Sequence, residues 1–533
     1  MSDRYAPYPY TPPPGLGAPE PRHPVVIVGA GPVGLSMAID LAQQGIRCVV
    51  LDDGDTVSVG SRAICWAKRT LEIFDRLGVG ETMLAKGVTW QVGRLFHGEK
   101  QVWEFDLLPE AGHKYPAFIN LQQYHVEHML LERAHAFADL IDLRFHNRVT
   151  DHADRGDHVE LIIETPDGNY TLEADWYLAC DGARSATRSR MALPFEGQSF
   201  EERFLIVDVE MPQSPFAVAE RPERWFWFAP PFHEGQSALL HKQPDDIYRI
   251  DLQLGPEADP EVEATEEKVL PRIRAIVGDT PFRLDWMSVY RFRCAMLDNF
   301  VHGRVIFVGD SAHVVSPFGA RGGNGGIQDV DNLGWKLALV LKGEASPSLL
   351  GSYDDERRHG ARENILHSGR ATNFMTPKSE MEALLRHEVL RLAETQPFAR
   401  RLINSGRLSQ PCSLDGRALQ TPGGAPIAPG SAMPDAPVVG KNGCRWLIEA
   451  LQGRFVLLGI GGTTLPDVPG LETVMVGPRG SGAEVEDTEG LVVQRYGRGA
   501  YLFRPDGHVC AFFDTPQIEE VEEALARAKG GSL

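Results

Sequence analysis

Three groups of residues have types and spacings that suit the binding of a dinucleotide cofactor. The first is the run Gly29-Ala30-Gly31-Pro32-Val33-Gly34, which lies between a predicted strand at 25–28 and a predicted helix at 35–44. In such a turn the first glycine permits the tight bend, the second lets the backbone approach a pyrophosphate, and the third lets the helix pack on the strand. The helix N-terminus attracts the phosphates. Asp52 ends the second strand about 20 residues later, where a carboxylate can accept hydrogen bonds from a ribose diol.

Two further motifs place acidic residues at the ends of predicted strands. Asp181 follows the apolar stretch 176–180. The third motif begins at Gly303 and leads into a predicted helix at 326–341. An acidic residue at the end of its strand could bind a ribityl hydroxyl, and a helix N-terminus after it suits a flavin ring that is negatively charged once reduced. The residues of interest in this third motif are Gly309, Asp310, Pro317, Gly323 and Asn324.

In this order the three motifs resemble those of the class A flavoprotein aromatic hydroxylases, the family of para-hydroxybenzoate and phenol hydroxylases. The resemblance spans about residues 24–375. It is greatest to the longer members, such as hydroxyphenylpropionate, pentachlorophenol and phenol hydroxylases. It implies FAD as the cofactor and NADH or NADPH as the co-substrate. The residues that it assigns to cofactor binding are Gly29, Gly31, Gly34, Asp52, Arg62, Gln123, Asp181, Gly309, Asp310, Pro317, Gly323 and Asn324.

Within this assignment Arg62 would lie near the pyrophosphate, Gln123 would contact the flavin and Asp310 would bind the ribityl chain. Some of these residues also have an ordinary structural alternative. Asp181 could cap a turn, and Arg62 could form a surface ion pair. Their joint occurrence favours the cofactor-binding interpretation.

The resemblance also implies a reaction. NAD(P)H would reduce the flavin, and a flavin C4a-hydroperoxide formed with dioxygen would hydroxylate a small aromatic, phenolic substrate. The protein would orient the ring, exclude water and help the phenol to lose its proton. No metal is expected. FAD motifs do not distinguish hydroxylation from epoxidation, decarboxylative hydroxylation or Baeyer-Villiger oxidation, and a non-catalytic flavin-binding interaction protein is an alternative from a different class.

Candidate catalytic residues are Tyr290, His241 and Pro317. Tyr290 is the first choice because the phenol hydroxylase branch has a substrate-contacting tyrosine at a similar motif position, although a core aromatic is the ordinary alternative. Arg249 could bind a substrate carboxylate or be a solvated edge charge. The phenol hydroxylase pattern also has an acidic residue near Arg62, where this chain is apolar around Cys65. That difference argues against phenol itself as the substrate.

The elements that position these residues predict an α/β fold: a Rossmann-type FAD-binding domain like that of para-hydroxybenzoate hydroxylase, with an inserted antiparallel β-sheet substrate domain and a C-terminal thioredoxin-like domain. Alternation of period two places Trp225 with Trp227, and Trp286 with Tyr290, on common faces of the inserted sheet. In place of CxxC the last domain has Gly461-Gly462-Thr463-Thr464, so a packing or dimerisation role is expected. The predicted parts are a disordered Pro-rich tail (1–22), the FAD-binding domain (23–199 and, with further helices, 296–403), the substrate sheet (200–295), a linker (404–434) and the thioredoxin-like domain (435–533).

Composition limits the expected number of domains, the binding partners and the cellular compartment. A chain of 533 residues with 43% hydrophobic and 24% charged residues is expected to form two to four globular domains. Its net charge of −20 would repel nucleic acid and anionic membranes, and no apolar stretch is long enough to span a bilayer. Seven scattered cysteines without a CxxC pair favour a reducing cytoplasm over a disulfide framework or a zinc site. The expected partners are therefore a small aromatic substrate and O2, with a homodimer as a further expectation.

Overall fold

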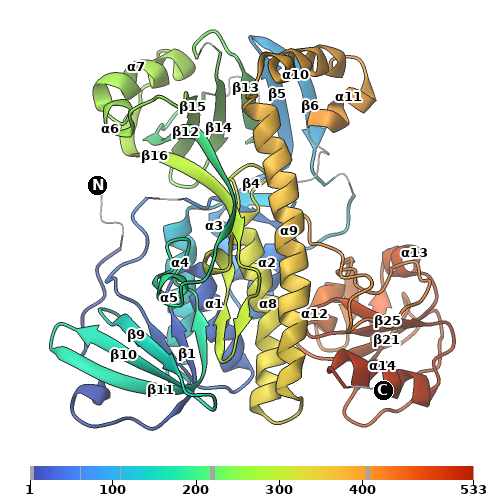
Figure 1. The fold of residues 1–533 in the computed structure, drawn as a ribbon. Coiled ribbons are helices and arrows are strands. Elements are labelled where there is room, and N and C mark those ends of the chain that lie inside the picture. The colour runs from blue at the N-terminus through green and yellow to red at the C-terminus, as the bar shows by residue number, and fades with distance from the viewer. Residues whose placement is uncertain are drawn as a thin grey trace.

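The computed structural model describes residues 5–60, 62–108, 110–215, 222–233, 235–403 and 409–531. It has a lower first domain, an upper inserted sheet and a C-terminal domain at the side of the first (Figure 1). The long helix α9 (Leu350–Met375) runs from the first domain to the inserted sheet and ties these two parts together.

Parallel strands form the centre of the first domain. Val25 to Val28 and Cys48 to Leu51 are buried, as expected for a parallel sheet covered on both faces. The central parallel strands, in spatial order, are β18 (Val305–Phe307), β11 (Gly168–Ala179), β1 (His23–Val28), β2 (Cys48–Leu51) and β8 (Ile141–Arg144). Antiparallel strands β9 (Arg148–Asp154), β10 (Val159–Thr165) and β17 (Val301–His302) extend the sheet. The helices are α1 (Pro32–Gln43), α2 (Lys68–Leu77), α3 (Gly80–Lys86), α4 (Gln123–His135), α5 (Ala186–Arg190) and α8 (Gly322–Leu341).

The register of these strands brings the three sequence motifs together. Val28 at the end of β1 pairs with Ala179, and Ala179 pairs with Phe307 at the end of β18. The glycine turn, the Asp181 segment and the Asp310 segment therefore all leave the sheet at one edge, at the carboxyl ends of parallel strands. This is the edge where open α/β sheets bind their ligands, so the predicted Rossmann-type fold is confirmed.

One local element differs from the prediction. The helical apolar spacing of residues 61–77 predicts a helix over this whole range, but the helix begins at Lys68, after the short strand β3 (Cys65–Ala67). This strand forms a small antiparallel sheet with β7 (Phe118–Asn120) and β4 (Val88–Trp90). The side chain of Asn324 holds it there, accepting a hydrogen bond from the backbone N–H of Ala67 (2.9 Å). Ser61 lies outside the described residues.

The inserted sheet is larger than the sequence pattern indicates. It recruits β5 and β6 from the segment assigned to the first domain, and β5 pairs in parallel with β13. Its strands, in spatial order, are β19 (His313–Val314), β16 (Arg283–Met296), β12 (Glu196–Glu210), β15 (Ile247–Leu254), β14 (Ser237–Lys242), β13 (Arg224–Phe228), β5 (Val92–His97) and β6 (Lys100–Asp106). Helices α10 (Glu380–Ala393) and α11 (Pro397–Ile403) lie beside β6 at the sheet edge.

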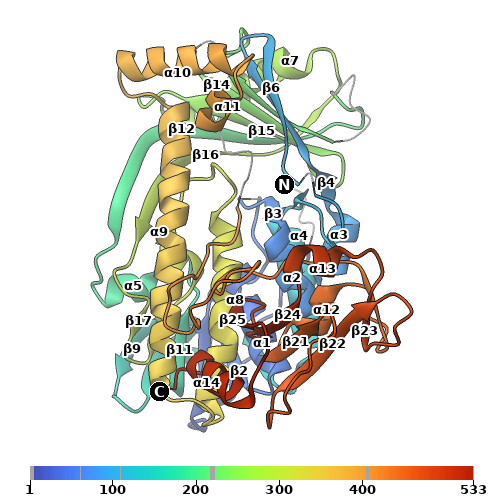
Figure 2. The same ribbon diagram turned by 90° about the vertical axis from the view of Figure 1, so that its right-hand side faces the viewer.

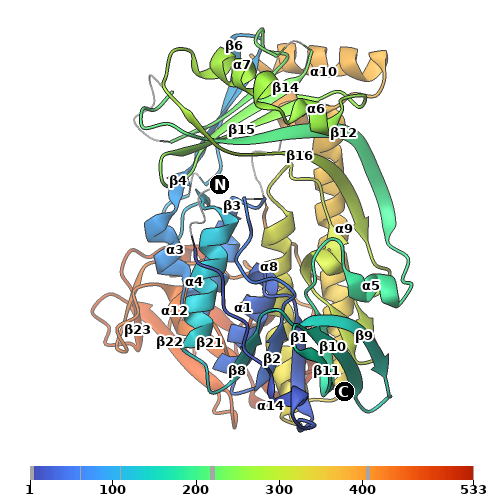
Figure 3. The ribbon, with the colours of Figure 1, turned by 90° about the vertical axis from the view of Figure 1, so that its left-hand side faces the viewer.

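The two faces of the inserted sheet have different partners. Trp227 and its neighbour Trp225 pack in an apolar core with helix α7 (Glu266–Val277), on the face turned away from the first domain (Figure 3). Helix α6 (Pro260–Glu263) precedes α7 on the same side. Trp286 and Tyr290 lie on the opposite face, because their cross-strand partners Asp208 and Phe204 are not part of that core. We call the face that carries Trp286 and Tyr290 the inner face.

Residues 5–22 pack against the first domain, in contrast to the expected disordered tail. The ring of Tyr8 stacks on Phe145 at 4.6 Å between centroids. Further along, Glu20 forms an ion pair with Arg144 (2.7 Å). The proline-rich composition predicts disorder, but aromatic stacking and a buried ion pair hold this segment in the structure.

The C-terminal domain contains a mixed sheet. Figure 2 shows it packed on the side of the first domain that carries α2 and α8. Its strands, in spatial order, are β20 (Val438–Gly440), β23 (Val485–Asp487), β22 (Glu472–Pro478), β21 (Val456–Ile460), β24 (Gly499–Phe503) and β25 (Val509–Phe513). Its helices are α12 (Leu447–Leu451), α13 (Leu491–Tyr496) and α14 (Ile518–Ala528). Its likeness to thioredoxin stays a prediction.

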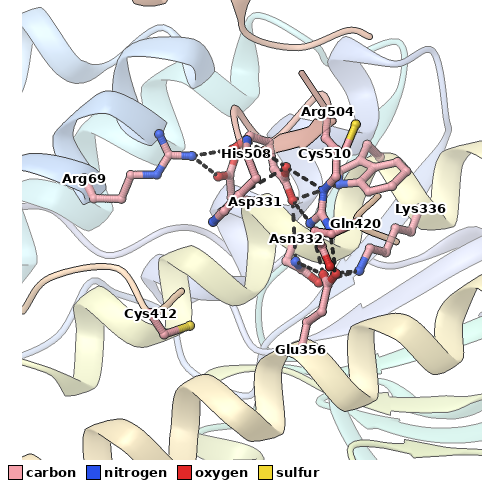
Figure 4. Close-up of polar contacts among 12 residues, drawn as sticks. Arg69, Asp331, Asn332, Lys336, Glu356, Cys412, Gln420, Arg504, His508 and Cys510 are labelled. Atoms are coloured by element: carbon pink, nitrogen blue, oxygen red, sulfur yellow. Dashed lines mark hydrogen bonds and ion pairs between the residues drawn. The ribbon is translucent and has the colours of Figure 1, made fainter. Parts of the chain in front are cut away.

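A buried ionic cluster joins this domain to the first (Figure 4). Arg504 donates to Glu356 of α9 at 2.6 Å and also pairs with Asp506. Lys336 of α8 reaches Glu356 at 2.8 Å. These four side chains are at most 1% exposed. Because an unpaired buried charge is costly, each member depends on the others being in place.

No helix among the described residues is long and apolar enough to cross a membrane. No group of His, Cys, Asp and Glu in these ranges is arranged to hold a metal ion. All seven cysteines lie within the described ranges and are free thiols.

The docking of the C-terminal domain is predicted to depend on pH through Asp435. This residue is 1% exposed, and burial, with Glu72 nearby, raises its pKa to about 6. In the unfolded chain the pKa is about 3.9. The protonated form is therefore favoured by folding, and this contribution is present below pH 4 and lost as the pH rises through 6. The loss amounts to about 3 kcal/mol.

Asp435→Asn, which cannot ionise, should remove this term. The difference in Tm or urea midpoint between wild type and variant should therefore change between pH 4 and pH 7, with the wild type losing stability relative to the variant. Asp467→Asn, at an exposed position of the same domain, is the control. A difference that is constant with pH would contradict the prediction.

Candidate cofactor and substrate site

The glycine turn after β1 has the geometry of a phosphate-binding loop. Gly29 has φ +107, and a Cβ there would lie 2.4 Å from the carbonyl oxygen of Cys180. A Cβ on Gly34 would lie 1.9 Å from the carbonyl oxygen of Gly29, so a side chain would push the helix off the turn. A Cβ on Gly31 would meet nothing within 4 Å. The two outer glycines are thus required for packing, while the middle one faces open space at the N-terminus of α1.

Asp52 supports this turn from the end of β2. Its Oδ2 accepts from the backbone N–H of Ala30 (2.6 Å), and its Oδ1 accepts from Gly54 (2.8 Å). An ionised carboxylate has about four lone-pair sites. Two therefore remain for a ligand such as a ribose diol.

Asp310 is carried by a short 3-10 turn, η2 (Gly309–Ser311), after β18. Asp329 of α8 fixes this turn: its Oδ2 accepts from the N–H of Gly309 (3.0 Å) and lies 2.7 Å from Nε2 of His313. Its Oδ1 accepts from Nε of Arg357 (2.6 Å). Burial opposes its ionisation, but His313 and Arg357 hold the pKa of Asp329 below its usual value. The sequence motif includes Asp329 in the helix after the glycine loop but indicates no role for it, because its partners Gly309, His313 and Arg357 are brought to it only by the fold.

The Asp310 side chain lies in a space that suits a buried ligand. It is exposed to solvent, yet protein surrounds its carboxyl closely enough for burial to raise its pKa. Among the described residues its carboxyl has no hydrogen-bond partner. An accessible but desolvated acid without a partner fits a cofactor hydroxyl better than bulk water.

Asp181 accepts hydrogen bonds from the first turn of α5 and keeps one oxygen without a partner. Its Oδ2 accepts from the N–H (2.9 Å) and Oγ1 (2.8 Å) of Thr187 in α5. Its Oδ1 is buried without a hydrogen-bond partner. One oxygen therefore has a structural role at the start of α5, and the other lies at the same sheet edge without a protein partner.

The remaining cofactor candidates lie on both sides of β3. Gln123, at the start of α4, accepts from the N–H of Ala63 (3.2 Å) and donates to Glu127 (2.8 Å). Asn324 uses both ends of its amide on the backbone, since it also donates to the carbonyl oxygen of Cys65 (2.8 Å). Its observed contacts are thus to β3 itself.

The first turn of α8 is tightly packed, whereas the start of the loop before it is open. A Cβ on Gly323 would lie 3.3 Å from the ring of Trp66. Pro317, at the start of the loop, is exposed. The structure therefore places Pro317, but not Gly323, where a side chain can meet a ligand freely.

The inner face of the inserted sheet meets the first domain at the Arg62 loop. The Arg62 guanidinium lies over the ring of Tyr290, 5.7 Å from its centroid. A Cβ on Gly60 would collide with the ring of Trp286. Burial raises the pKa of Tyr290, and the charges of Arg62 and Asp310 both act on it. Tyr290, the first-choice substrate residue, thus lies against the Arg62 loop and within the electrostatic influence of Asp310.

Two other polar candidates on this face already have protein partners. Arg249 is buried and donates from Nε (2.8 Å) and Nη2 (2.7 Å) to both oxygens of Asp208. His241 is 2% exposed, and its Nε2 lies 3.8 Å from Asp251. Burial lowers the pKa of His241 to about 4, so the ring is neutral at pH 7. Arg249 is therefore neither a solvated edge charge nor a free anion-binding group.

Cys65 of β3 faces the same interior space. Its thiol donates to Oδ1 of Asn120 (3.2 Å), and burial raises its pKa to about 11. Cys65 is thus a neutral group in the region where the phenol hydroxylase pattern has an acidic residue.

Comparison with known proteins supports the assignment of this geometry. Residues 22–368 match the family described as "FAD binding domain". A 3-(3-hydroxy-phenyl)propionate/3-hydroxycinnamic acid hydroxylase of Mycolicibacterium gilvum is 30% identical, covering 76% of this chain and 69% of that protein. A 12-dehydrotetracycline 5-monooxygenase/anhydrotetracycline 6-monooxygenase of Streptomyces rimosus is 28% identical, covering 92% of this chain and 95% of that protein.

The fold has a solved counterpart over almost its whole length. The flavin-dependent monooxygenase PieE, solved with FAD and substrate, aligns with a TM-score of 0.82 at 22% identity, covering 97% of this chain and 100% of that chain. At this identity the likeness speaks for the fold alone. The family match covers more than half of the chain, and NAD(P)H as a co-substrate is typical of the family. The chain therefore belongs to the FAD binding domain family of class A flavin-dependent monooxygenases, and its cofactor is FAD.

Proposed function

We propose that this monooxygenase hydroxylates a small phenolic compound, with NADH or NADPH as the reductant and O2 as the oxidant. The observation that carries the proposal is the contact of the Tyr290 ring on the inner face with the Arg62 guanidinium of the first domain (5.7 Å), within the electrostatic reach of Asp310. It supports a single space in which an aromatic ring bound to the sheet faces the cofactor. The M. gilvum relative is a 3-(3-hydroxy-phenyl)propionate/3-hydroxycinnamic acid hydroxylase, which is consistent with this substrate class.

The residues present fit FAD, and we propose that they divide its binding among them. Gly31 leaves room at the N-terminus of α1 for the pyrophosphate, and Asp52 keeps lone pairs for the adenosine ribose. Asp310, accessible and without a partner, would bind a ribityl hydroxyl. The other proposed cofactor residues are Gly29, Gly34, Arg62, Gln123, Asp181, Gly309, Pro317, Gly323 and Asn324.

Bound FAD supplies the electron transfer from NAD(P)H and the activation of O2. The chain's own part is to hold the substrate, exclude water and manage one proton. The Tyr290 hydroxyl keeps its proton at pH 7, because burial raises its pKa, so it would donate a hydrogen bond to a phenolate oxygen. Such a bond stabilises the electron-rich form of the ring that is attacked. His241, neutral at pH 7, would orient the substrate rather than carry charge.

We also propose a cytoplasmic location, because all seven cysteines are free thiols. We further propose that the protein forms a homodimer, with the C-terminal domain as the contact between subunits.

The first test of the site is Asp310→Ala. Because the Asp310 carboxyl has no partner in the described chain, its loss should leave the fold intact and remove a ligand contact. The variant should purify largely free of flavin, measured as FAD released per chain, while its Tm matches that of the wild-type apoprotein. Normal FAD occupancy would overturn the assignment of Asp310.

A second test removes the charge that holds the Asp310 turn. Asp329→Asn leaves Arg357 as an uncompensated buried cation, which should cost about 3–5 kcal/mol of stability and lower FAD occupancy as well. Asp355→Asn, on the exposed side of α9, is the control and should shift stability by no more than about 0.5 kcal/mol. Equal Tm and flavin content in the two variants would contradict the role given to Asp329.

The proposed reaction is tested by NAD(P)H oxidation with the holoenzyme across substituted phenols and hydroxyphenyl acids, with product mass spectrometry and a peroxide assay. Stimulated oxidation with a product heavier by one oxygen atom is expected. Peroxide alone, or no stimulation by any phenol, would refute a phenolic substrate and favour another reaction of the same cofactor.

A further inference from the structure

A cavity of about 800 Å³ lies where the C-terminal domain meets the first domain, between α13 and the start of α2 (Figure 2). The first domain also contributes the end of β3 and several residues between 107 and 117. The remaining wall comes from the linker, at 409–411 and between 427 and 434. Protein interiors leave few voids larger than a water molecule, whereas sites for small molecules have volumes of about 300–1,000 Å³. The cavity therefore has the size of a ligand site, and the proposed reaction does not use it.

Much of the cavity wall is apolar. On the side of the first domain, Leu107 and Phe118 belong to a buried cluster with Trp90. On the other side, Met433 of the linker and Leu491 of α13 line the cavity. Contact with a ligand would remove this apolar surface from water. The wall therefore favours a ligand with a hydrocarbon or aromatic body.

The charged part of the wall contains an arginine without a carboxylate partner. Arg495 of α13 donates to the carbonyl oxygens of Ala111 (2.5 Å), Gly112 (2.9 Å) and Asp435. It forms no ion pair with a carboxylate among the described residues. These bonds use three of the five N–H donors of the guanidinium, so two are left. The backbone thus holds the Arg495 side chain in place but does not neutralise its charge.

His113 lines the same cavity with an unused nitrogen. Its Nδ1 is buried and has no hydrogen-bond partner among the described residues. Burial, with the charges of Lys68 and Arg495, lowers the pKa of His113 to about 4. Glu72 and Glu110 act in the opposite direction but more weakly. The ring is therefore neutral at pH 7, and the electrostatic potential around it is positive.

The carboxylates beside the cavity do not cancel this potential. Glu72 is shared between Lys68 and Arg69. Glu110 is exposed to solvent, which screens its charge. The described lining thus contains three cations, Lys68, Arg69 and Arg495, against the two carboxylates Glu72 and Glu110. An apolar wall beside an excess of positive charge is suited to a ligand that combines an apolar body with an anionic group.

We infer that this cavity is a binding site for an organic anion, with the apolar body of the ligand against Phe118 and its anionic group near Arg495 and His113. The two free N–H groups of the guanidinium and the Nδ1 of the histidine can donate hydrogen bonds to its oxygens. Neither Tyr290 nor Asp310 lines the cavity. The inference is therefore independent of the proposed phenolic substrate.

The first experiment compares two ligands of the same shape on the holoenzyme, 2-naphthalenesulfonate and the neutral 2-naphthalenesulfonamide, by calorimetric titration. The wild type should bind the sulfonate at least about 10-fold more tightly. Arg495→Met should remove most of this preference. His113→Phe should weaken sulfonate binding by about 3- to 10-fold. Its Tm without ligand should not fall below that of the wild type, because the Nδ1 has no partner to lose.

Gln494 provides a test that leaves the fold intact. Arg495 supports the backbone at 111–112, so Arg495→Met is expected to lower the Tm as well. Gln494 lines the cavity, is exposed and makes no side-chain hydrogen bond among the described residues. Gln494→Lys should tighten sulfonate binding by about 3-fold, and Gln494→Glu should weaken it by about 3-fold. The same two changes at Gln517, an exposed residue of this domain outside the cavity, should leave the affinity unchanged.

Competition identifies the source of the anion. NADP+ and 4-hydroxybenzoate are each tested for displacement of the sulfonate, in the wild type and in Gln494→Glu. Displacement by NADP+ alone would assign the cavity to the nicotinamide co-substrate. Displacement by 4-hydroxybenzoate alone would assign it to an acidic aromatic compound bound outside the substrate site. If neither displaces the sulfonate, the site stands and takes another organic anion.

Three results would refute the inference. The wild type binds neither ligand, it binds the sulfonamide as tightly as the sulfonate, or Gln494→Lys and Gln494→Glu have equal affinity for the sulfonate. None of these measurements involves turnover of a phenol. The proposed function and the inference can therefore fail separately.

Discussion

The buried carboxylate of Asp329 is the interaction on which the site most depends. It has no exposed surface and joins three elements: the turn that carries Asp310, the histidine that follows it, and Arg357 of α9. A buried ion pair is costly unless its geometry is good and both charged groups make their hydrogen bonds. Here the Asp329 oxygens meet one backbone donor and two side chains. The position of the Asp310 turn relative to α8 and α9 is therefore set by electrostatics as well as by packing.

The same two helices carry this constraint to the C-terminal domain. Glu356 precedes Arg357 on α9, and it faces Arg504 of the C-terminal domain and Lys336 of α8. A buried cluster of this kind contributes little net stability compared with an apolar interface, but it tolerates only one arrangement of its members. Asp329 joins α8 and α9 through its contact with Arg357. Arg504 of the C-terminal domain thus holds the same two helices together through Lys336 and Glu356. This gives that domain a structural purpose that does not require dithiol chemistry.

The parts of the site that the sequence could predict are local ones. The glycine turn, Asp52 and Asp310 each follow a strand whose apolar pattern can be read directly, and the parallel register then brings them to one edge. Asp329, the addition of β5 and β6 to the inserted sheet, and the packing of residues 5–22 all depend on partners far along the chain. The helix expected from Ser61 illustrates the limit: its amphipathic spacing continues through 65–67, but an amide from Asn324 holds that stretch as a strand.

Arg249 of the inner face shows why substrate residues are harder to predict than cofactor residues. It occupies a strand position in the inserted sheet, and its residue type alone would allow it to bind a substrate anion or to be a solvated edge charge. The strand register excludes both, because it sets Asp208 directly opposite Arg249, and both carboxylate oxygens of Asp208 accept from the guanidinium. A shift of one residue in this pairing would move Asp208 to the other face of the sheet and leave Arg249 unpaired. The register of this sheet thus determines which charges are available to a ligand, and residue types alone do not contain that information.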